Sequence, residues 1–176
     1  LTAIDGDSFT ATLTAQDDTQ GNGLVIVQAS YFDLSGNPGA TQSGVVLIDT
    51  QNPTVSVEIA EASLNVGTNS SLVRFEFSES VEGFGADDVT TSGGTLSNFV
   101  VVDGDTLTAT FTANENVETL ASVSVGSAYT DSVGNTGTVG SGTVSIDTLA
   151  ISASIVFAED PLNVSSNSSI VGIEFS

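Results

Sequence analysis

The feature that most constrains this chain is an internal repeat. The segment LTAIDGDSFTATLTA (1–15) aligns without a gap with FVVVDGDTLTATFTA (99–113), 98 residues further on. The same offset aligns residues 49–78 with residues 147–176. A fixed period of this length indicates a tandem array of similar units, each the size of a small domain. We therefore divide the chain into the end of one unit (1–48), a complete unit (49–146) and the start of a third (147–176).

The strand pattern of the complete unit predicts its fold class. Short runs rich in Val, Thr, Leu and Phe are separated by clusters of Gly, Asn, Asp and Ser. In the runs 71–77 and 106–112 every second residue is apolar, so one face of each strand is expected to face a core. Helical periodicity is absent. We predict an all-β antiparallel sandwich with seven strands, near 54–60, 71–77, 87–91, 95–102, 106–112, 120–125 and 141–146. The expected core residues are Phe75, Phe77, Leu107 and Phe111.

The charge of the chain limits its partners. The sequence has 22 acidic residues and one basic residue, Arg74, and its formal net charge is −21. Nucleic acid and anionic membrane surfaces are excluded as partners, because binding them requires clusters of Lys and Arg. Self-repulsion of this size destabilises a compact state unless cations bind or the salt concentration is high. Bound calcium is the expected remedy, and adaptation to high salt without specific ion sites is the alternative.

The residue types that are missing argue against an enzyme. The sequence contains no Cys, Met, Trp or His, which removes thiol and histidine chemistry. Paired carboxylates can hydrolyse glycosides, and the pairs Asp87 with Asp88 and Asp103 with Asp105 are present. Neighbouring residues of one loop rarely face each other across a substrate, so we expect no catalytic residues. No apolar run is long enough to cross a bilayer, and no membrane insertion is expected.

Five segments carry a resemblance to a known family. They are FEFSESVEGFGADDV (75–89), TLTATFTA (106–113), YTDSVGNTG (129–137) and the junctions LIDTQNPTV (47–55) and SIDTLAISA (145–153). In this order and at a fixed period, the chain resembles the bacterial immunoglobulin-like repeats of giant secreted adhesins of the RTX and biofilm-associated type. The second junction departs from the pattern, because it lacks the proline found at Pro53. The resemblance implies tandem immunoglobulin-like sandwiches, an extracellular location at the cell surface and a role in cell adhesion.

Strand direction sorts the loops of the complete unit into two ends. If the strands alternate in direction, the linker at Asp49 and the loops 78–88, 103–105 and 127–140 share one end. The loops 61–70, 92–94 and 113–118 share the other end with the linker at Asp147. Calcium prefers about six to eight oxygen ligands. The candidate ligands at the first junction are Asp17, Asp49, Glu79, Asp87, Asp88, Asp103, Asp105, Asp131 and Asn135, and the equivalents in the other units are Asp33, Asn37 and Asp147.

Each candidate also has a simpler explanation. Asp103-Gly104-Asp105 fits a hairpin turn, because Gly allows a positive φ and Asp tolerates turn geometry. Asp131 to Asn135 fits an Asx-type turn, although its recurrence at Asp33 to Asn37 and its own place beside the linker favour a ligand role. Glu79 is equally explained as a solvated loop carboxylate. Asp49 and Asp147 could serve only to end a strand.

These observations lead to one functional hypothesis and one alternative. The chain is expected to be a spacer of a large bacterial adhesin, stiffened by calcium at the junctions between repeats. Its partners would be neighbouring repeats of the array and, as an alternative for the incomplete units, other copies of the chain. The competing hypothesis is a binding module whose own surface recognises a carbohydrate or a cell-surface protein. We also expect that residues 1–48 and 147–176 do not complete one sandwich within a single chain, because they flank the middle unit.

Overall fold

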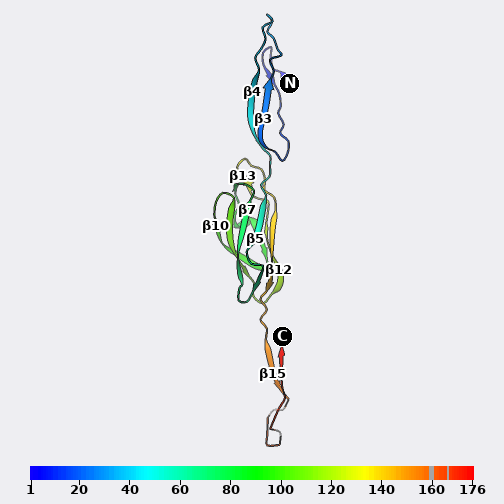
Figure 1. Ribbon diagram of the computed structural model, residues 1–176, viewed down its shortest axis with the longest axis vertical. Coiled ribbons are helices and arrows are strands. Elements are labelled where there is room, and N and C mark those ends of the chain that lie inside the picture. Colours follow the sequence, from blue (N-terminus) through cyan, green and yellow to red (C-terminus); the bar gives the residue numbers. More distant parts are fainter. Residues whose placement is uncertain (159–160, 166) are drawn as a thin grey trace.

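The protein is extended along one axis and has three successive parts (Figure 1). The computed structural model describes residues 1–158, 161–165 and 167–176. A sandwich occupies the middle, and hairpins lie at its two ends, β3 (Gln20–Val27) with β4 (Gln42–Asp49) and β15 (Ala153–Phe157) with β16 (Val171–Phe175). Two short strands, β1 (Thr2–Ala3) and β2 (Phe9–Thr10), pair near the amino terminus.

Two four-stranded sheets form the middle sandwich. The first has the order β10-β11-β7-β5, with strands at Gly94–Val101, Thr106–Ala113, Ser70–Phe77 and Val55–Ile59. The second has the order β6-β14-β12-β9, with strands at Ser63–Asn65, Gly140–Asp147, Glu118–Val125 and Val89–Ser92. All pairings are antiparallel except that of β6 with β14. This strand order is that of an immunoglobulin-like sandwich, and the predicted all-β fold class is confirmed.

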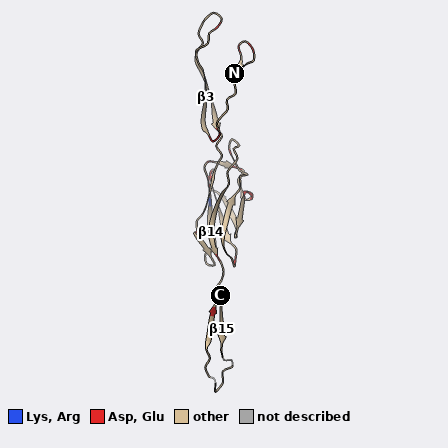
Figure 2. Cartoon of the chain, turned by 90° about the vertical axis from the view of Figure 1, so that its right-hand side faces the viewer, with Lys and Arg blue, Asp and Glu red and all other residues tan. Residues whose placement is uncertain are grey.

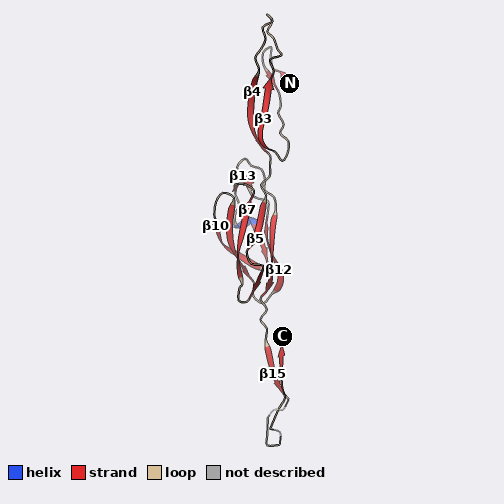
Figure 3. Ribbon diagram, in the orientation of Figure 1, coloured by secondary structure: helices blue, strands red, loops and turns tan. Residues whose placement is uncertain are grey.

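Four short elements were not predicted. The strand β6 pairs in parallel with the end of β14, and β8 (Val81–Glu82) pairs with β13 (Thr130–Asp131) beside the first linker. A single 3₁₀ turn, η1 (Ala86–Asp88), is the one helical element in the described ranges (Figure 3). The Asp88 carboxylate accepts a hydrogen bond from the Gly85 amide at 2.9 Å, which closes this turn. Helices long and apolar enough to cross a membrane are absent from the residues that the structure describes.

The core lies between the two sheets of the middle sandwich. All four predicted core residues, Phe75, Phe77, Leu107 and Phe111, are buried. Phe77 also packs edge-on against Tyr129, with ring centroids 5.0 Å apart. Burial raises the pKa of Tyr129, and the hydrogen bonds to Thr138 act in the opposite direction. The core is completed by buried residues from β6, β7, β11, β12 and β14, namely Leu64, Val73, Ala109, Ala113, Ala121, Val123, Val125, Val144 and Ile146.

The sheets approach each other closely where β14 passes β5. A Cβ atom placed on Gly140 would lie 2.6 Å from the Val55 carbonyl oxygen, and one on Gly142 would lie 2.6 Å from that of Val57. These separations are shorter than van der Waals contact, so only glycine fits at either position. The two glycines therefore allow the first and last long strands of the unit to pack backbone against backbone.

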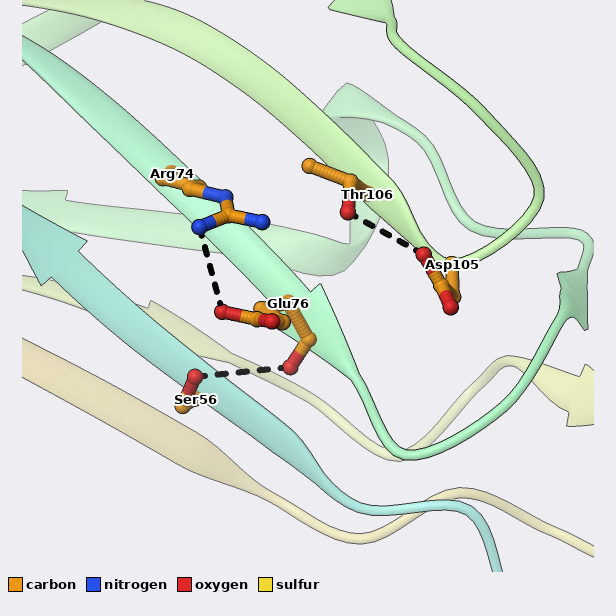
Figure 4. Close-up of polar contacts among 5 residues, drawn as sticks. All are labelled: Ser56, Arg74, Glu76, Asp105 and Thr106. Carbon is orange, nitrogen blue, oxygen red and sulfur yellow. Dashed lines mark hydrogen bonds and ion pairs between the residues drawn. The ribbon is translucent and has the colours of Figure 1, made fainter.

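Acidic residues occur in all three parts of the chain (Figure 2). The one basic side chain, Arg74 on β7, forms an ion pair with Glu76 at 3.3 Å on the exposed face of the sheet (Figure 4). An exposed pair of this kind contributes only about 0–1 kcal/mol to stability. Arg74 therefore compensates little of the negative charge.

The two outer hairpins lie at opposite ends of the middle sandwich and belong to separate sheets (Figure 1). The expectation that they do not close into one sandwich within a chain agrees with this arrangement. Their apolar side chains, including Val25, Val46 and Phe175, are largely exposed. Among the residues that the structure describes, the outer parts therefore have paired strands but no facing layer that buries them.

Candidate metal centre

The hydrogen bonds of the middle unit confirm the predicted sorting of loops at the first linker. The Phe77 amide donates to the Asp105 carbonyl at 2.8 Å, and the Val81 amide donates to the Gly104 carbonyl at 3.1 Å. The hairpin 103–105 is thereby joined to the loop that follows β7. The pairing of β8 with β13 joins the same loop to residues 130–131. Three loops that are distant in the sequence thus meet beside Asp49.

Three carboxylates come together at this end of the sandwich. One oxygen each from Asp49, Glu79 and Asp131 lies within 4.8 Å of the other two. Asp49 is the last residue of β4, Glu79 comes two residues after β7, and Asp131 is the last residue of β13. Asp131 is buried, and the other two are half-buried. The group therefore brings one residue of the linker close to two separate loops of the middle unit.

Asp131 is fixed by its own loop. Its Oδ1 accepts hydrogen bonds from the amides of Val133 at 2.9 Å, Gly134 at 2.7 Å and Asn135 at 2.8 Å. Gly134 has a φ of 96°, a left-handed conformation that favours glycine. Burial acts to raise the pKa of Asp131, but the hydrogen bonds from Asn135 and the loop amides outweigh it and lower the pKa. Asp131 is therefore held as an anion.

Glu79 has the opposite electrostatic environment. Partial burial raises the pKa of Glu79, and the negative charges of Asp49 and Asp131 raise it further. No hydrogen bond to its carboxylate offsets these effects among the described contacts. Burial and the two neighbouring carboxylates therefore act against ionisation of Glu79.

The amide of Asn135 connects the group. Its Nδ2 donates to Asp131 Oδ2 at 2.7 Å and to the Asp49 carbonyl oxygen at 3.2 Å. The side chain of Gln20, from the preceding unit, donates to Asp49 Oδ2 at 2.9 Å. Asp49 thus contacts both the unit that it leaves and the unit that it enters. Gln20 was not predicted as part of the site, because no sequence pattern indicates a neutral amide opposite an Asp at the end of a strand.

The remaining candidates of the middle unit lie outside the three-carboxylate group. Asp103 Oδ1 accepts the Asp105 amide at 3.3 Å, and Asp105 Oδ1 accepts the Thr106 hydroxyl at 3.1 Å (Figure 4). Interaction with the Asp105 side chain lowers the pKa of Asp103. These bonds support the hairpin-turn interpretation. Asp88 closes the 3₁₀ turn, and its neighbour Asp87 is likewise absent from the group. Their predicted ligand role has no support from this geometry.

Asp17 also stands apart from the group. The contact that the structure gives this residue is made by its main-chain carbonyl, which accepts the Thr19 hydroxyl at 3.3 Å. Its carboxylate is not among the three that come together. A ligand role for Asp17 remains a prediction.

The equivalent residues in the first, incomplete unit show which hydrogen bonds of the site arise within a single loop. Asp33 Oδ1 accepts the amides of Ser35 and Asn37, both at 2.8 Å, and Asn37 Nδ2 donates to Asp33 Oδ2 at 2.7 Å. Hydrogen bonds from Asn37 lower the pKa of Asp33. The loop thus adopts the same arrangement at residues 33–37 as at 131–135, where a linker is close by. An Asx-type turn and a ligand role are therefore compatible at Asp131.

Asp147 repeats the local geometry of Asp49 at the second junction. Its Oδ1 accepts the Leu149 amide at 3.2 Å, as Asp49 Oδ1 accepts the Gln51 amide at 3.2 Å. Glu118 is the pairing partner of Asp147, at the position that Gln20 occupies opposite Asp49. The second junction therefore places two carboxylates opposite each other where the first has a carboxylate and an amide.

Comparison with known proteins identifies the family of the chain. A sequence profile described as a bacterial Ig-like domain matches residues 49–151, more than half of the sequence. The chain belongs to the bacterial Ig-like domain family. None of the curated proteins searched matches it. Domains of this family are typically structural modules and not enzymes, and they are often surface-exposed or extracellular.

Proposed function

We propose that the chain is part of an extracellular spacer of a bacterial adhesin, in which calcium bound at the junctions fixes the orientation of successive repeats. One observation carries the proposal: Asp49 from the linker and Glu79 and Asp131 from the next unit have oxygens within 4.8 Å of one another. An ion bound to all three would join the linker directly to the sandwich.

The donor chemistry fits calcium. The three side chains offer only oxygen, and the sequence contains no His or Cys that would favour a softer transition metal. Calcium accepts irregular arrangements of carboxylates, carbonyls and water, whereas magnesium requires near-octahedral geometry. Bound calcium would place positive charge beside Glu79, whose pKa is raised by burial and by the charges of Asp49 and Asp131.

The array supports the spacer role. The repeat period and the end-to-end arrangement of the three parts give a long, narrow assembly (Figure 1). In such an array each unit contacts mainly its neighbours, which are therefore the partners that we propose. Orientation at the junctions then decides whether the array is stiff or flexible.

Calorimetric titration of the chain with calcium, at constant ionic strength in sodium chloride, tests the proposal. Calcium is expected to bind and to raise the unfolding temperature of the middle unit. Binding to the folded state alone contributes about 2.7 kcal/mol when the free ion is at a hundredfold excess over Kd. An equal stabilisation by sodium chloride at the same ionic strength would support salt adaptation and contradict a specific site.

Substitution of Glu79 by Gln tests the site, because its effect on stability should be opposite with and without calcium. Without calcium, Glu79→Gln should stabilise the middle unit at neutral pH, because it removes an anion that the site disfavours. With saturating calcium the same variant should be less stable than the unsubstituted chain, because a ligand is lost. Glu82→Gln, on the exposed part of β8, is the matched control and should show neither effect. Destabilisation by Glu79→Gln in both conditions would contradict the proposed site.

The pH dependence follows from the raised pKa of Glu79. A carboxyl whose pKa is higher in the folded state binds its proton more tightly there. Its contribution to stability is complete below the ordinary pKa of 4.5 and is lost as the pH rises through the raised folded value. In EGTA, stability attributable to Glu79 should therefore decrease over this interval. The difference between wild type and Glu79→Gln, measured by denaturation at several pH values, isolates it.

A further inference from the structure

The first linker is also attached to the unit that precedes it. The Thr50 amide donates to the Thr19 carbonyl at 2.9 Å, and the Thr50 hydroxyl donates to the Gln16 carbonyl at 2.7 Å. The same hydroxyl oxygen accepts the Thr19 amide at 3.0 Å. One residue thus makes these three hydrogen bonds to the loop that precedes β3, and its hydroxyl also lies 3.3 Å from the Thr19 carbonyl.

The arrangement recurs at the second linker. The Thr148 amide donates to the Val117 carbonyl at 2.8 Å, its hydroxyl donates to the Asn114 carbonyl at 2.8 Å, and its oxygen accepts the Val117 amide at 3.0 Å. The partner residues differ from those of Thr50, but every partner group is a main-chain amide or carbonyl. The bonds therefore depend on the path of the loop and on the threonine hydroxyl, not on the side chains of the loop.

The other end of the first linker is attached to the following unit. The Pro53 carbonyl accepts the Thr138 amide at 2.9 Å, and Pro53 is itself buried. The Thr54 amide donates to the Ser78 hydroxyl at 3.0 Å, and the Ser78 amide donates to the Thr54 carbonyl at 3.0 Å. Only residues 51 and 52 lie between these two points of attachment.

We propose that Thr50 and Thr148 are calcium-independent clamps, which confine the hinge between neighbouring repeats to the residues that follow them. Two residues supply four soft backbone dihedrals, so a change of orientation at the first linker is confined to rotations at Gln51 and Asn52. The inference rests on the proposed spacer role, but not on calcium. The calcium ligands are arranged around this hinge, because Asp49 precedes it while Glu79 and Asp131 follow it. An ion would therefore bridge the hinge.

The second clamp can be tested in the full chain, since the loop that Thr148 contacts belongs to the complete middle unit. In EGTA, ¹⁵N relaxation should show an ordered amide at Thr148, with an order parameter of about 0.85, and flexible amides at Leu149 and Ala150, below about 0.6. Uniform order, or uniform disorder, across residues 147–150 would overturn the proposal without reference to calcium.

Substitution of the hydroxyl separates the clamp from general packing. Thr148→Val keeps the branched shape but removes the bonds, and the amide of Val117 should then exchange with solvent up to about tenfold faster. Thr148→Ser keeps the hydroxyl and should preserve slow exchange. Equal exchange in all three proteins, or protection of Val117 that appears only with calcium, would contradict the clamp. A clamp found together with no calcium binding would leave this inference standing and overturn the calcium proposal.

Discussion

The middle unit and the hairpins on either side of it contain the same strand pairings in different surroundings. In the middle unit Val123 pairs with Gly142, and in the first hairpin the equivalent Val25 pairs with Gly44. Val123 is 0% exposed, whereas Val25 is 49% exposed. Strand pairing and register are therefore properties of the local sequence, and burial comes only from the opposite layer of a complete sandwich.

The strands at the start of the repeat show the same conserved register. Val57 pairs with Phe75 in the middle unit, and Ile155 pairs with Ile173 in the last hairpin, in the same register. Because an isolated two-stranded hairpin is marginally stable in water, most of the stability should reside in the middle unit. Equivalent substitutions should therefore have unequal effects, and the following predictions test this difference.

Truncation of a core aromatic should give the largest difference. Phe77 is 4% exposed, and its equivalent Phe175 is 73% exposed. Phe77→Ala should destabilise the middle unit by about 3–5 kcal/mol, because it leaves a cavity. Phe175→Ala should leave the unfolding transition of the middle unit unchanged. Urea denaturation followed by circular dichroism measures both, and equal losses would show that the last hairpin is buried in solution.

Addition of one methyl group should have a smaller effect. Gly142→Ala should cost about 1–3 kcal/mol, because the new Cβ would lie 2.6 Å from the Val57 carbonyl oxygen. The equivalent Gly44 has no atom within 4 Å of a Cβ built on it, so Gly44→Ala is the control. Thermal unfolding of both variants provides the comparison. Destabilisation by Gly44→Ala would mean that a second layer covers the first hairpin.

Removal of one hydroxyl group should cost less again. Tyr129 is buried and donates to the Thr138 carbonyl at 2.7 Å, whereas Tyr31 is half exposed and donates to the Ala40 carbonyl at 3.1 Å. Tyr129→Phe should destabilise the middle unit by about 1 kcal/mol. Tyr31→Phe should have no measurable effect on the same denaturation curve. A loss of several kcal/mol at Tyr129 would indicate that its second neighbour, the Pro53 carbonyl, depends on the hydroxyl as well.

Replacement of the single basic residue should have the smallest effect. Arg74 and Glu76 are about half exposed, so Arg74→Ala should change stability by less than about 1 kcal/mol, and the change should shrink in high salt. Urea denaturation at two salt concentrations tests this. The last unit has Gly172 at the equivalent position, so the ion pair is not a constant feature of the repeat. A large effect would show that Arg74 neutralises more of the acidic surface than its contact with Glu76 indicates.

The fold could be predicted from the sequence because its signals are local and repeated. Alternation in 71–77 and 106–112 identified Phe75, Phe77 and Phe111 as core, and the fixed period located the complete unit. The short strands β6, β8 and β13 were missed. Two or three residues are too few for an alternation pattern, and their pairing depends on loops brought together by the long strands.

The candidate site could be predicted only in part. Placing the linker and three loops at one end correctly brought Asp49, Glu79 and Asp131 together. The same prediction also included Asp103 and Asp105. Strand direction shows at which end of the sandwich a loop lies, but it does not show where the side chains of the loop point. The hydroxyl of Thr50 gave no signal, since its partners are main-chain groups that no residue type reveals.

The parallel pairing of β6 with β14 determines how the middle unit would resist a mechanical load. Tension along the long axis pulls the first strands toward one linker and β14 toward the other. Ser63 pairs with Ser145, Leu64 with Ile146 and Asn65 with Asp147, all with the strands in the same direction. Because these strands are pulled in opposite senses along their length, their hydrogen bonds are loaded together in shear, and none is peeled away first. In the proposed spacer role, a pull between the two linkers would have this direction, and the pairing of the short strand β6 with β14 would oppose it.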